Sequence, residues 1–421
     1  MYKKDYIRTL RRVKIVLGNG FDLRCGLHTT YSDYYCKNYH KYLYIQDLYF
    51  EYSKTDKINF DFQDEKIKLL NVWDIFFALN SSKYPKMCKQ RWCDIEKMML
   101  SSFANADVRI QNELKISGHD ISKINWNTIN DLLFSNKLGI NHTDRFVVLF
   151  IKAKIEYQKR HLVDLYQFLL DELKDFEKQF GIFIYNQLHD SFLEETNHGE
   201  PFLNNKYIMM AQNTLNELCD KNNIVCIDSF NYSYIDPMVN RTQYINGSWE
   251  DPIFGVDSIF EPEENEYIFT KSSRRIDSDL FNTVFETKKG FENLIIYGHS
   301  LDSADYSYFF PAFDKLKLTD SLSTNVVVFA YSIYDKNESK VIRCELKKAI
   351  SDIMYAYAIS KNLSDPKRFL DSLSTQRRIL TYEIPNIKRE EYPHSFNDQE
   401  WYKIYKEIDS LTDDVHETII N

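Results

Sequence analysis

The fold of this chain is indicated by the stretch Val13-Lys14-Ile15-Val16-Leu17-Gly18-Asn19-Gly20-Phe21-Asp22. Its first half is a short apolar run rich in β-branched residues, which predicts a buried strand. Glycines directly after a buried strand let the backbone approach a diphosphate, whose charge the N–H groups of a following helix can satisfy. Because Gly-x-Gly after a strand is a weak signal by itself, a plain tight turn is the alternative interpretation.

Three more runs of the same kind occur later, at residues 224–227, 294–297 and 326–330, and each is followed by a polar or glycine-bearing turn. Their hydrophobicity is continuous rather than alternating. This pattern is typical of strands in a parallel sheet that helices cover on both faces. We therefore predict an α/β fold with a doubly wound, mainly parallel, Rossmann-like sheet.

The segment between the first and second runs is far longer than one βαβ crossover requires, and its pattern is helical. Its clearest helical element starts at a capping signal, Asn141–Asp144, and carries apolar residues at helical spacing as far as Phe180, just before Gly181. We predict a nucleotide-binding core made of residues 1–40 and 221–350, a helical insertion lobe over 41–220, and a helical C-terminal extension over 351–421.

Composition excludes several classes of protein. A formal net charge of -9 and a pI of about 5.7 give no footprint of a general nucleic-acid binder. The longest apolar run, Phe146–Ile151, is too short to span a bilayer, and the amino terminus lacks an apolar signal-peptide core, so we expect a cytoplasmic protein with no membrane contact. The 7 cysteines show no Cys-x-x-Cys pattern, which predicts neither a disulfide framework nor a zinc site, and we expect no metal.

Two polar motifs follow the second run. The first, Ile227-Asp-Ser-Phe-Asn231-Tyr-Ser233, places Asn231 at the carboxyl end of a predicted strand, which is the edge where open α/β sheets bind ligands. An asparagine that caps or turns its own loop is the alternative. The second motif is Tyr244-Ile-Asn246-Gly247-Ser-Trp.

A third motif, Gly298-His299-Ser300-Leu-Asp-Ser-Ala-Asp305, follows the run at 294–297. From the local sequence alone, Ser300 is interpreted as the cap of the next helix and His299 as a strand-end residue. A hydrolase nucleophile elbow needs Gly-x-Ser-x-Gly, and Asp302 stands where the second glycine would be, so we reject it.

These strings resemble the motifs of the AbiH family of bacterial phage-defence proteins. The resemblance covers Gly18-Asn-Gly-Phe-Asp-Leu with Gly-Leu and Thr-x-Tyr after it, Phe230-Asn-Tyr, the Gly298-His-Ser-Leu loop with Asp305 and Tyr308-Phe309, and Trp92-x-Asp94-x-Glu96. They also resemble, more loosely, the NAD-binding motifs of sirtuins. The resemblance implies a sirtuin-like core with NAD as substrate or ligand.

That resemblance also assigns the candidate site. It implies Asn231, Asn246 and His299 as catalytic residues, and as cofactor-binding residues Gly18, Asn19, Gly20, Phe21, Asp22, Gly247, Gly298, Ser300 and Asp305. The chain departs from both families at Asn246, because they carry a histidine before the glycine. An imidazole takes a proton near neutral pH and a carboxamide does not.

The function implied is an anti-phage abortive-infection effector that hydrolyses NAD to nicotinamide and ADP-ribose when triggered, with activity weakened or absent because of Asn246. The alternative is a catalytically silent module that binds NAD or ADP-ribose and acts through partners or assembly. A nuclease effector is a weaker third hypothesis, since no acidic metal cluster of known pattern occurs. A phage-derived trigger, a partner defence protein and a homo-oligomer stay open as partners.

Overall fold

The computed structural model describes residues 3–55, 57–81, 142–158, 165–190, 206–233, 242–255, 267–276, 290–333 and 339–384. The chain divides into two compact units. The first, here the sheet unit, contains Met1–Thr29 and Phe180–Lys406, and the second, the helical unit, contains Thr30–Gln179 and Glu407–Asn421.

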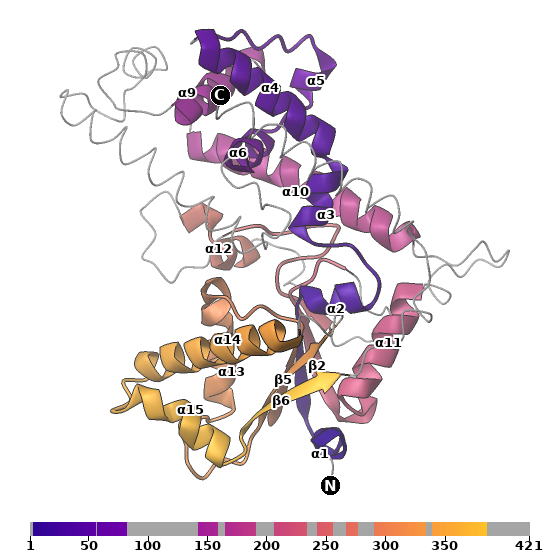
Figure 1. The fold of residues 1–421 in the computed structure, drawn as a ribbon, viewed down its shortest axis with the longest axis vertical. Helices are drawn as coiled ribbons and strands as arrows, with labels where there is room; N and C mark the ends of the chain where they lie inside the picture. The colour runs from indigo at the N-terminus through magenta and orange to yellow at the C-terminus, as the bar shows by residue number, and fades with distance from the viewer. Residues whose placement is uncertain are drawn as a thin grey trace, which may run out of the picture. The chain divides into compact units, whose positions relative to one another are not determined.

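The sheet unit is built on a six-stranded sheet in which every pairing is parallel (Figure 1). Its order is β3-β2-β1-β4-β5-β6. The strands are β1 (Val13–Leu17), β2 (Ile224–Ser229), β3 (Thr242–Tyr244), β4 (Asn293–Tyr297), β5 (Val327–Ser332) and β6 (Ile379–Ile384). The four apolar runs of the sequence form the four central strands, which confirms the predicted doubly wound α/β sheet.

Helices cover the two faces of this sheet, as its continuous hydrophobicity requires. On one face Val16, Ile296 and Phe329 share a buried core with the helices α13 (Tyr306–Lys315), α14 (Ser339–Ser360) and α15 (Pro366–Thr375). Figure 1 shows α11 (Lys206–Leu218) on the other side of the strands. There the buried Arg24, at the end of α2 (Asn19–Arg24), donates to Thr214 of α11 and to Ser332 at the end of β5.

Two strands were not predicted. β3 has three residues, which is too short for a periodicity signal, and β6 pairs with β5 at the other edge of the sheet. The predicted helical C-terminal extension is therefore wrong in part: α14 and α15 are helical, but Ile379–Ile384 is a strand of the sheet. The run Ile-Leu-Thr-Tyr-Glu-Ile is only partly buried, as an edge strand allows, so it lacks the continuous apolar pattern of the central strands.

The helical unit holds α3 (Tyr31–Lys37), α4 (Tyr39–Thr55), α5 (Glu65–Lys68), α6 (Val72–Ser81), α9 (His142–Tyr157) and the first part of α10 (Leu165–Asp190). Aromatic side chains fill its core. Trp73 and Phe77 of α6 are almost completely buried, and Phe77 packs against Phe176 of α10 with ring centroids 5.1 Å apart. Within the described part of the predicted insertion the regular elements are helices, as its spacing predicts.

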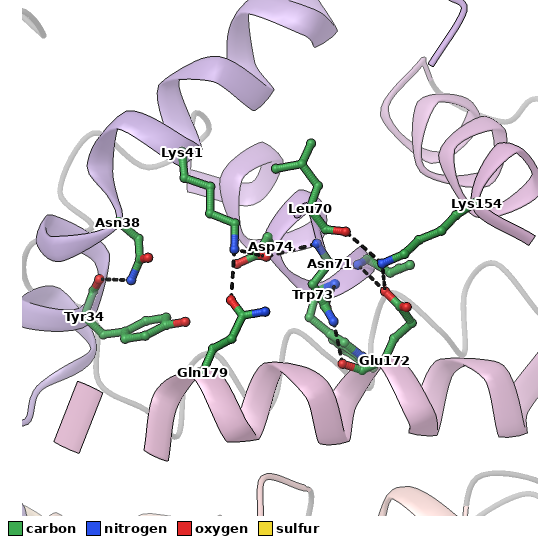
Figure 2. Close-up of polar contacts among 11 residues, drawn as sticks. Tyr34, Asn38, Lys41, Leu70, Asn71, Trp73, Asp74, Lys154, Glu172 and Gln179 are labelled. Atoms are coloured by element: carbon green, nitrogen blue, oxygen red, sulfur yellow. Dashed lines mark hydrogen bonds and ion pairs between the residues drawn. The ribbon is translucent and has the colours of Figure 1, made fainter. Parts of the chain in front are cut away.

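Buried ion pairs also connect the helices of this unit (Figure 2). Lys154 of α9 binds Glu172 of α10, with Nζ 2.6 Å from Oε2. The same carboxylate accepts the backbone N–H of Val72 at the start of α6. On the other side of α6, Lys41 of α4 pairs with the fully buried Asp74 and donates to Gln179.

The boundary of the insertion differs from the predicted one. α10 does not end before Gly181 but continues to Asp190, and α11 packs with the sheet unit. Gly181 has another role, because a Cβ atom there would lie 2.1 Å from the carbonyl oxygen of Trp249. The glycine permits close approach of α10 to that backbone rather than ending the helix. The helix α1 (Lys3–Thr9) precedes β1.

Candidate functional site

The predicted site residues follow the carboxyl ends of four neighbouring strands. Since all strands are parallel, the loops after β3, β2, β1 and β4 leave the sheet at one edge. The chain order runs outward in one direction from β1 to β2 and β3, and in the other direction from β4 to β5 and β6. The topological switch point therefore lies between β1 and β4, where open α/β sheets bind ligands.

The glycines after β1 and β4 bring these two loops into direct contact. The N–H of Gly18 donates to the carbonyl of Tyr297, and that of Gly20 to the carbonyl of Gly298, each over 2.9 Å. A Cβ at Gly298, whose φ is 67°, would lie 2.7 Å from the nitrogen of Phe21. The packing of one loop on the other thus requires glycine here; that these residues also hold a diphosphate stays a prediction.

Asp22, which follows the first of these loops, is buried, with 1% of its surface exposed. Three side chains donate to its carboxylate: Ser233 at 2.7 Å, Tyr207 at 2.9 Å and Asn231 at 3.0 Å. The hydroxyl of Thr29 lies 3.2 Å from the carboxylate and shares its one proton between Asp22 and Asn19. Burial nevertheless raises the pKa of Asp22 to about 6, although these hydrogen bonds lower it. In this structure the predicted ligand-binding carboxylate contacts protein groups and orients their side chains.

Asn231 joins the loop after β2 to the loop after β1. Its side-chain nitrogen donates to the carbonyl of Gly18 and to Asp22, each over 3.0 Å. Because both neighbours are acceptors, the orientation of the amide is fixed, with Nδ2 toward the protein. Among the described residues no hydrogen bond reaches its Oδ1, which is the remaining acceptor of this side chain.

Asn246 closes the turn after β3. Its Nδ2 donates to the carbonyl of Phe230 over 3.2 Å, and its Oδ1 accepts from Arg275 over 3.3 Å. Gly247 has a φ of 81°, in the left-handed region, and a Cβ there would lie 2.0 Å from the carbonyl oxygen of Asp251. Both polar ends of the Asn246 amide therefore form hydrogen bonds that attach this turn to neighbouring segments.

His299 is enclosed within the loop after β4. Its Nδ1 accepts the N–H of Leu301 over 2.9 Å, and its Nε2 lies 3.5 Å from Asp305. Burial lowers the pKa of the imidazole, so the neutral ring is favoured. Asp305 also pairs with Lys271, whereas Ser300 is exposed.

The remaining predicted positions are Asn19 and Phe21. The Oδ1 of Asn19 accepts from Thr29 over 2.7 Å, and Phe21 is completely buried against Tyr297, ring edge to face. Asn19 thus lies in the loop at the switch point, whereas Phe21 belongs to the hydrophobic core.

A second buried polar group lies on the α13 face of the sheet. Lys14, the second residue of β1, pairs with Asp228, which also accepts the hydroxyl of Tyr308. Tyr308 in turn packs edge to face against Phe230 at 4.9 Å between centroids. A lysine inside an otherwise apolar strand was the signal in the sequence for a buried ion pair.

Sequence reasoning missed several residues of the site. Tyr207, Lys271 and Arg275 contact the predicted residues, but they come from helices that carry none of the motifs. α12 (Lys271–Ile276) supplies two of them. Its sequence, Lys-Ser-Ser-Arg-Arg-Ile, is a basic cluster in an acidic chain. That contrast was the signal in the sequence by which these residues could have been found.

Other expectations concern metals, membranes and the Trp92-x-Asp94-x-Glu96 motif. The described segments contain no cluster of three or more histidine, cysteine, aspartate or glutamate side chains that could hold a metal. None of the helices in these segments combines the length and apolarity needed to cross a membrane. Trp92, Asp94 and Glu96 lie outside the described residues.

The strand order and the loops at its switch point define a protein of the Rossmann-like, doubly wound α/β class. The chain belongs to the AbiH family of bacteriophage abortive-infection proteins, whose model matches residues 15–329. This range includes every predicted site residue, and the family places the protein in abortive infection. No curated protein and no solved structure matches the chain.

Proposed function

We propose that this protein acts in abortive infection by binding NAD across the switch point between β1 and β4 and by hydrolysing it slowly to nicotinamide and ADP-ribose. The observation that carries the proposal is the meeting of the Gly18–Gly20 and Gly298–Ser300 loops at this point. In this class of fold, the crevice at a switch point is the usual place for a dinucleotide.

Asn231 supports the hydrolytic part. Loss of nicotinamide passes through an oxocarbenium-like state, which depends on orientation of the ribose and of the attacking water more than on a strong nucleophile. The amide nitrogen of Asn231 is anchored to Gly18 and Asp22, so Oδ1 has a fixed direction. A carbonyl oxygen held in this way can accept a hydrogen bond from a water or from a ribose hydroxyl.

The expected rate is low because the candidate proton acceptors are occupied. The Asn246 carboxamide does not take a proton near neutral pH, and its two ends bind Phe230 and Arg275. His299 uses Nδ1 for Leu301 and directs Nε2 toward Asp305. These contacts favour the second candidate function, a silent NAD- or ADP-ribose-binding module.

The two functions are separated by measuring binding and turnover on the full chain. NAD binding is followed by calorimetry and nicotinamide release by chromatography, with the wild type and Asn246→His. A general base typically contributes about two to four orders of magnitude in rate, so we expect Asn246→His to release nicotinamide faster than the wild type.

Asn222→His is the matched control, because Asn222 is exposed and lies just before β2, at the amino edge of the sheet. Binding without release in all variants would identify the silent module. Absence of both binding and release would refute an NAD site at this edge.

A further inference from the structure

The loop after β4 has a strained backbone. Gly298 has a φ of 67°, and Leu301, three residues later, has a φ of 56°. A side chain with a Cβ rarely adopts this left-handed region, because the Cβ approaches the following carbonyl. Leu301 is 2% exposed and belongs to the core cluster of the α13 face, so the surrounding packing opposes relaxation of this backbone.

The side chain of His299 holds the same loop from within. The N–H of Leu301 donates to Nδ1 over 2.9 Å, and a ring nitrogen accepts a hydrogen bond only when it carries no proton. The single proton of the neutral ring is therefore assigned to Nε2, which faces Asp305. The rings of Phe230 and Phe309 enclose the imidazole, with centroids at 4.4 and 5.1 Å.

Lys271 balances the charge of Asp305. Its Nζ lies 3.6 Å from Oδ1 of Asp305, while Nε2 of His299 lies 3.5 Å from Oδ2. The lysine side chain is 3% exposed and that of Asp305 10%. Asp302 is the other acidic group acting on the imidazole, and it favours protonation, as Asp305 does. Burial and the cation of Lys271 both oppose protonation and lower the pKa of His299.

We propose that Lys271 is a positioning residue: by pairing with Asp305 it keeps Nδ1 of His299 unprotonated, and so holds the Gly298–Leu301 loop in its strained conformation. The proposal rests on the proposed function in one respect, namely that this loop with its exposed Ser300 takes part in NAD binding. Lys271 belongs to α12, outside the sequence motifs, and nothing in the local pattern of the chain assigns it to this loop.

The consequence of losing the lysine follows from charge balance. Without Lys271, the buried carboxylate of Asp305 is balanced best by an imidazolium. Protonated His299 has a hydrogen on each nitrogen, so Nδ1 stops accepting the N–H of Leu301. The backbone at Leu301 then loses the hydrogen bond that helps to hold its positive φ.

The test is a nuclear magnetic resonance experiment on the full-length protein labelled with ¹⁵N and ¹³C in histidine, with the His299 signals assigned through His299→Gln. In the wild type we expect the neutral Nε2–H tautomer at pH 7. Lys271→Met is expected to raise the pKa of His299 by about one unit or more, the usual effect of removing a nearby charge. Lys271→Arg should restore the wild-type titration, since it keeps the cation.

Lys361→Met is the matched control, because it removes the same charge from a more exposed pair, in which Lys361 lies 2.6 Å from Asp314. It should leave His299 unchanged. The wild-type spectrum alone would overturn the proposal if it showed a proton on Nδ1 at pH 7, even if Lys271→Met did not fold. An unchanged titration in folded Lys271→Met would overturn it as well.

Calorimetric titration with NAD separates this proposal from the proposed function. If the wild type binds NAD, Lys271→Met should weaken binding by about tenfold, whereas Lys361→Met should not. If the wild type does not bind NAD, the proposed function fails, and the tautomer and titration of His299 still decide the role of Lys271.

Discussion

The side-chain amide of Asn231 donates to the carboxylate of Asp22 over 3.0 Å, although 209 positions separate the two residues in the chain. The same amide donates to Gly18 at the end of β1. These hydrogen bonds unite the first two motifs of the sequence into one polar unit at the carboxyl edge of the sheet. They also give each residue a distinct role, since Asp22 is buried and orients the amide, whereas Asn231 retains an acceptor.

The first prediction separates the contribution of Asn231 from that of the network around it. Asn231→Ala removes the oriented carbonyl, so we expect it to abolish the residual release of nicotinamide. Ser233→Ala is the control, because Ser233 also donates to Asp22, over 2.7 Å, but leaves the Asn231 amide in place. Nicotinamide release and thermal unfolding are measured on both. Equal release by the two variants, at similar stability, would remove Asn231 from the proposed chemistry.

The second prediction concerns close packing at Gly298. Gly26→Ala introduces a Cβ at a φ of 87° into open space, so we expect it to cost only the left-handed strain of about 1–2 kcal/mol. Gly298→Ala has the same strain and also places the Cβ 2.7 Å from the nitrogen of Phe21. Overpacking of this kind adds about 1–3 kcal/mol. Free energies of unfolding from urea titrations should rank Gly298→Ala as the more destabilising, and equal values would argue against a tight contact between the loops.

The third prediction is a pH dependence caused by Asp22. Because burial raises its pKa from 3.8 to about 6, the native protein retains a proton that the unfolded chain has already lost between these values. The contribution of this group to stability is therefore complete below pH 4 and is lost as the pH rises through 6, by roughly 3 kcal/mol in total.

Asp22→Asn does not titrate there, while His299 and the other groups titrate in both proteins, so the difference between the two unfolding free energies isolates Asp22. Wild type minus variant should fall between pH 4 and 7. A difference that stays constant over this interval would show that the native carboxylate is not destabilised by burial.

The fourth prediction concerns the ion pair inside the helical unit. Lys154→Met leaves Glu172 buried without its cation, which typically costs about 3–5 kcal/mol. Lys178→Met is the matched control, because Lys178 pairs with Asp175 at the surface and such pairs contribute little. Urea unfolding of both variants gives the comparison. If Lys154→Met were as stable as the control, the buried pair would not hold α9 and α10 together.

The sequence by itself determined the class of fold. Val13–Leu17 and the three later apolar runs are local signals, because a strand buried on both faces must be apolar along its whole length. The glycines after the first and fourth strands were likewise visible, and so were the asparagines and the histidine that follow neighbouring strands. Parallel strands all end at the same edge of the sheet, so residues that follow their carboxyl ends come together there. This follows from the direction of the strands alone.

Only the tertiary structure decided the partners of these residues. The sequence does not show that Lys271 balances Asp305, that Tyr207 donates to Asp22, or that Gly181 lies inside a helix against Trp249. β6 was missed for a related reason, since an edge strand is only partly buried and its pattern resembles that of other polar segments. The periodicity of apolar residues indicates which face of a helix or strand is buried. Contacts between side chains of distant segments depend on their shapes and charges, and these side chains come together only after the chain has folded.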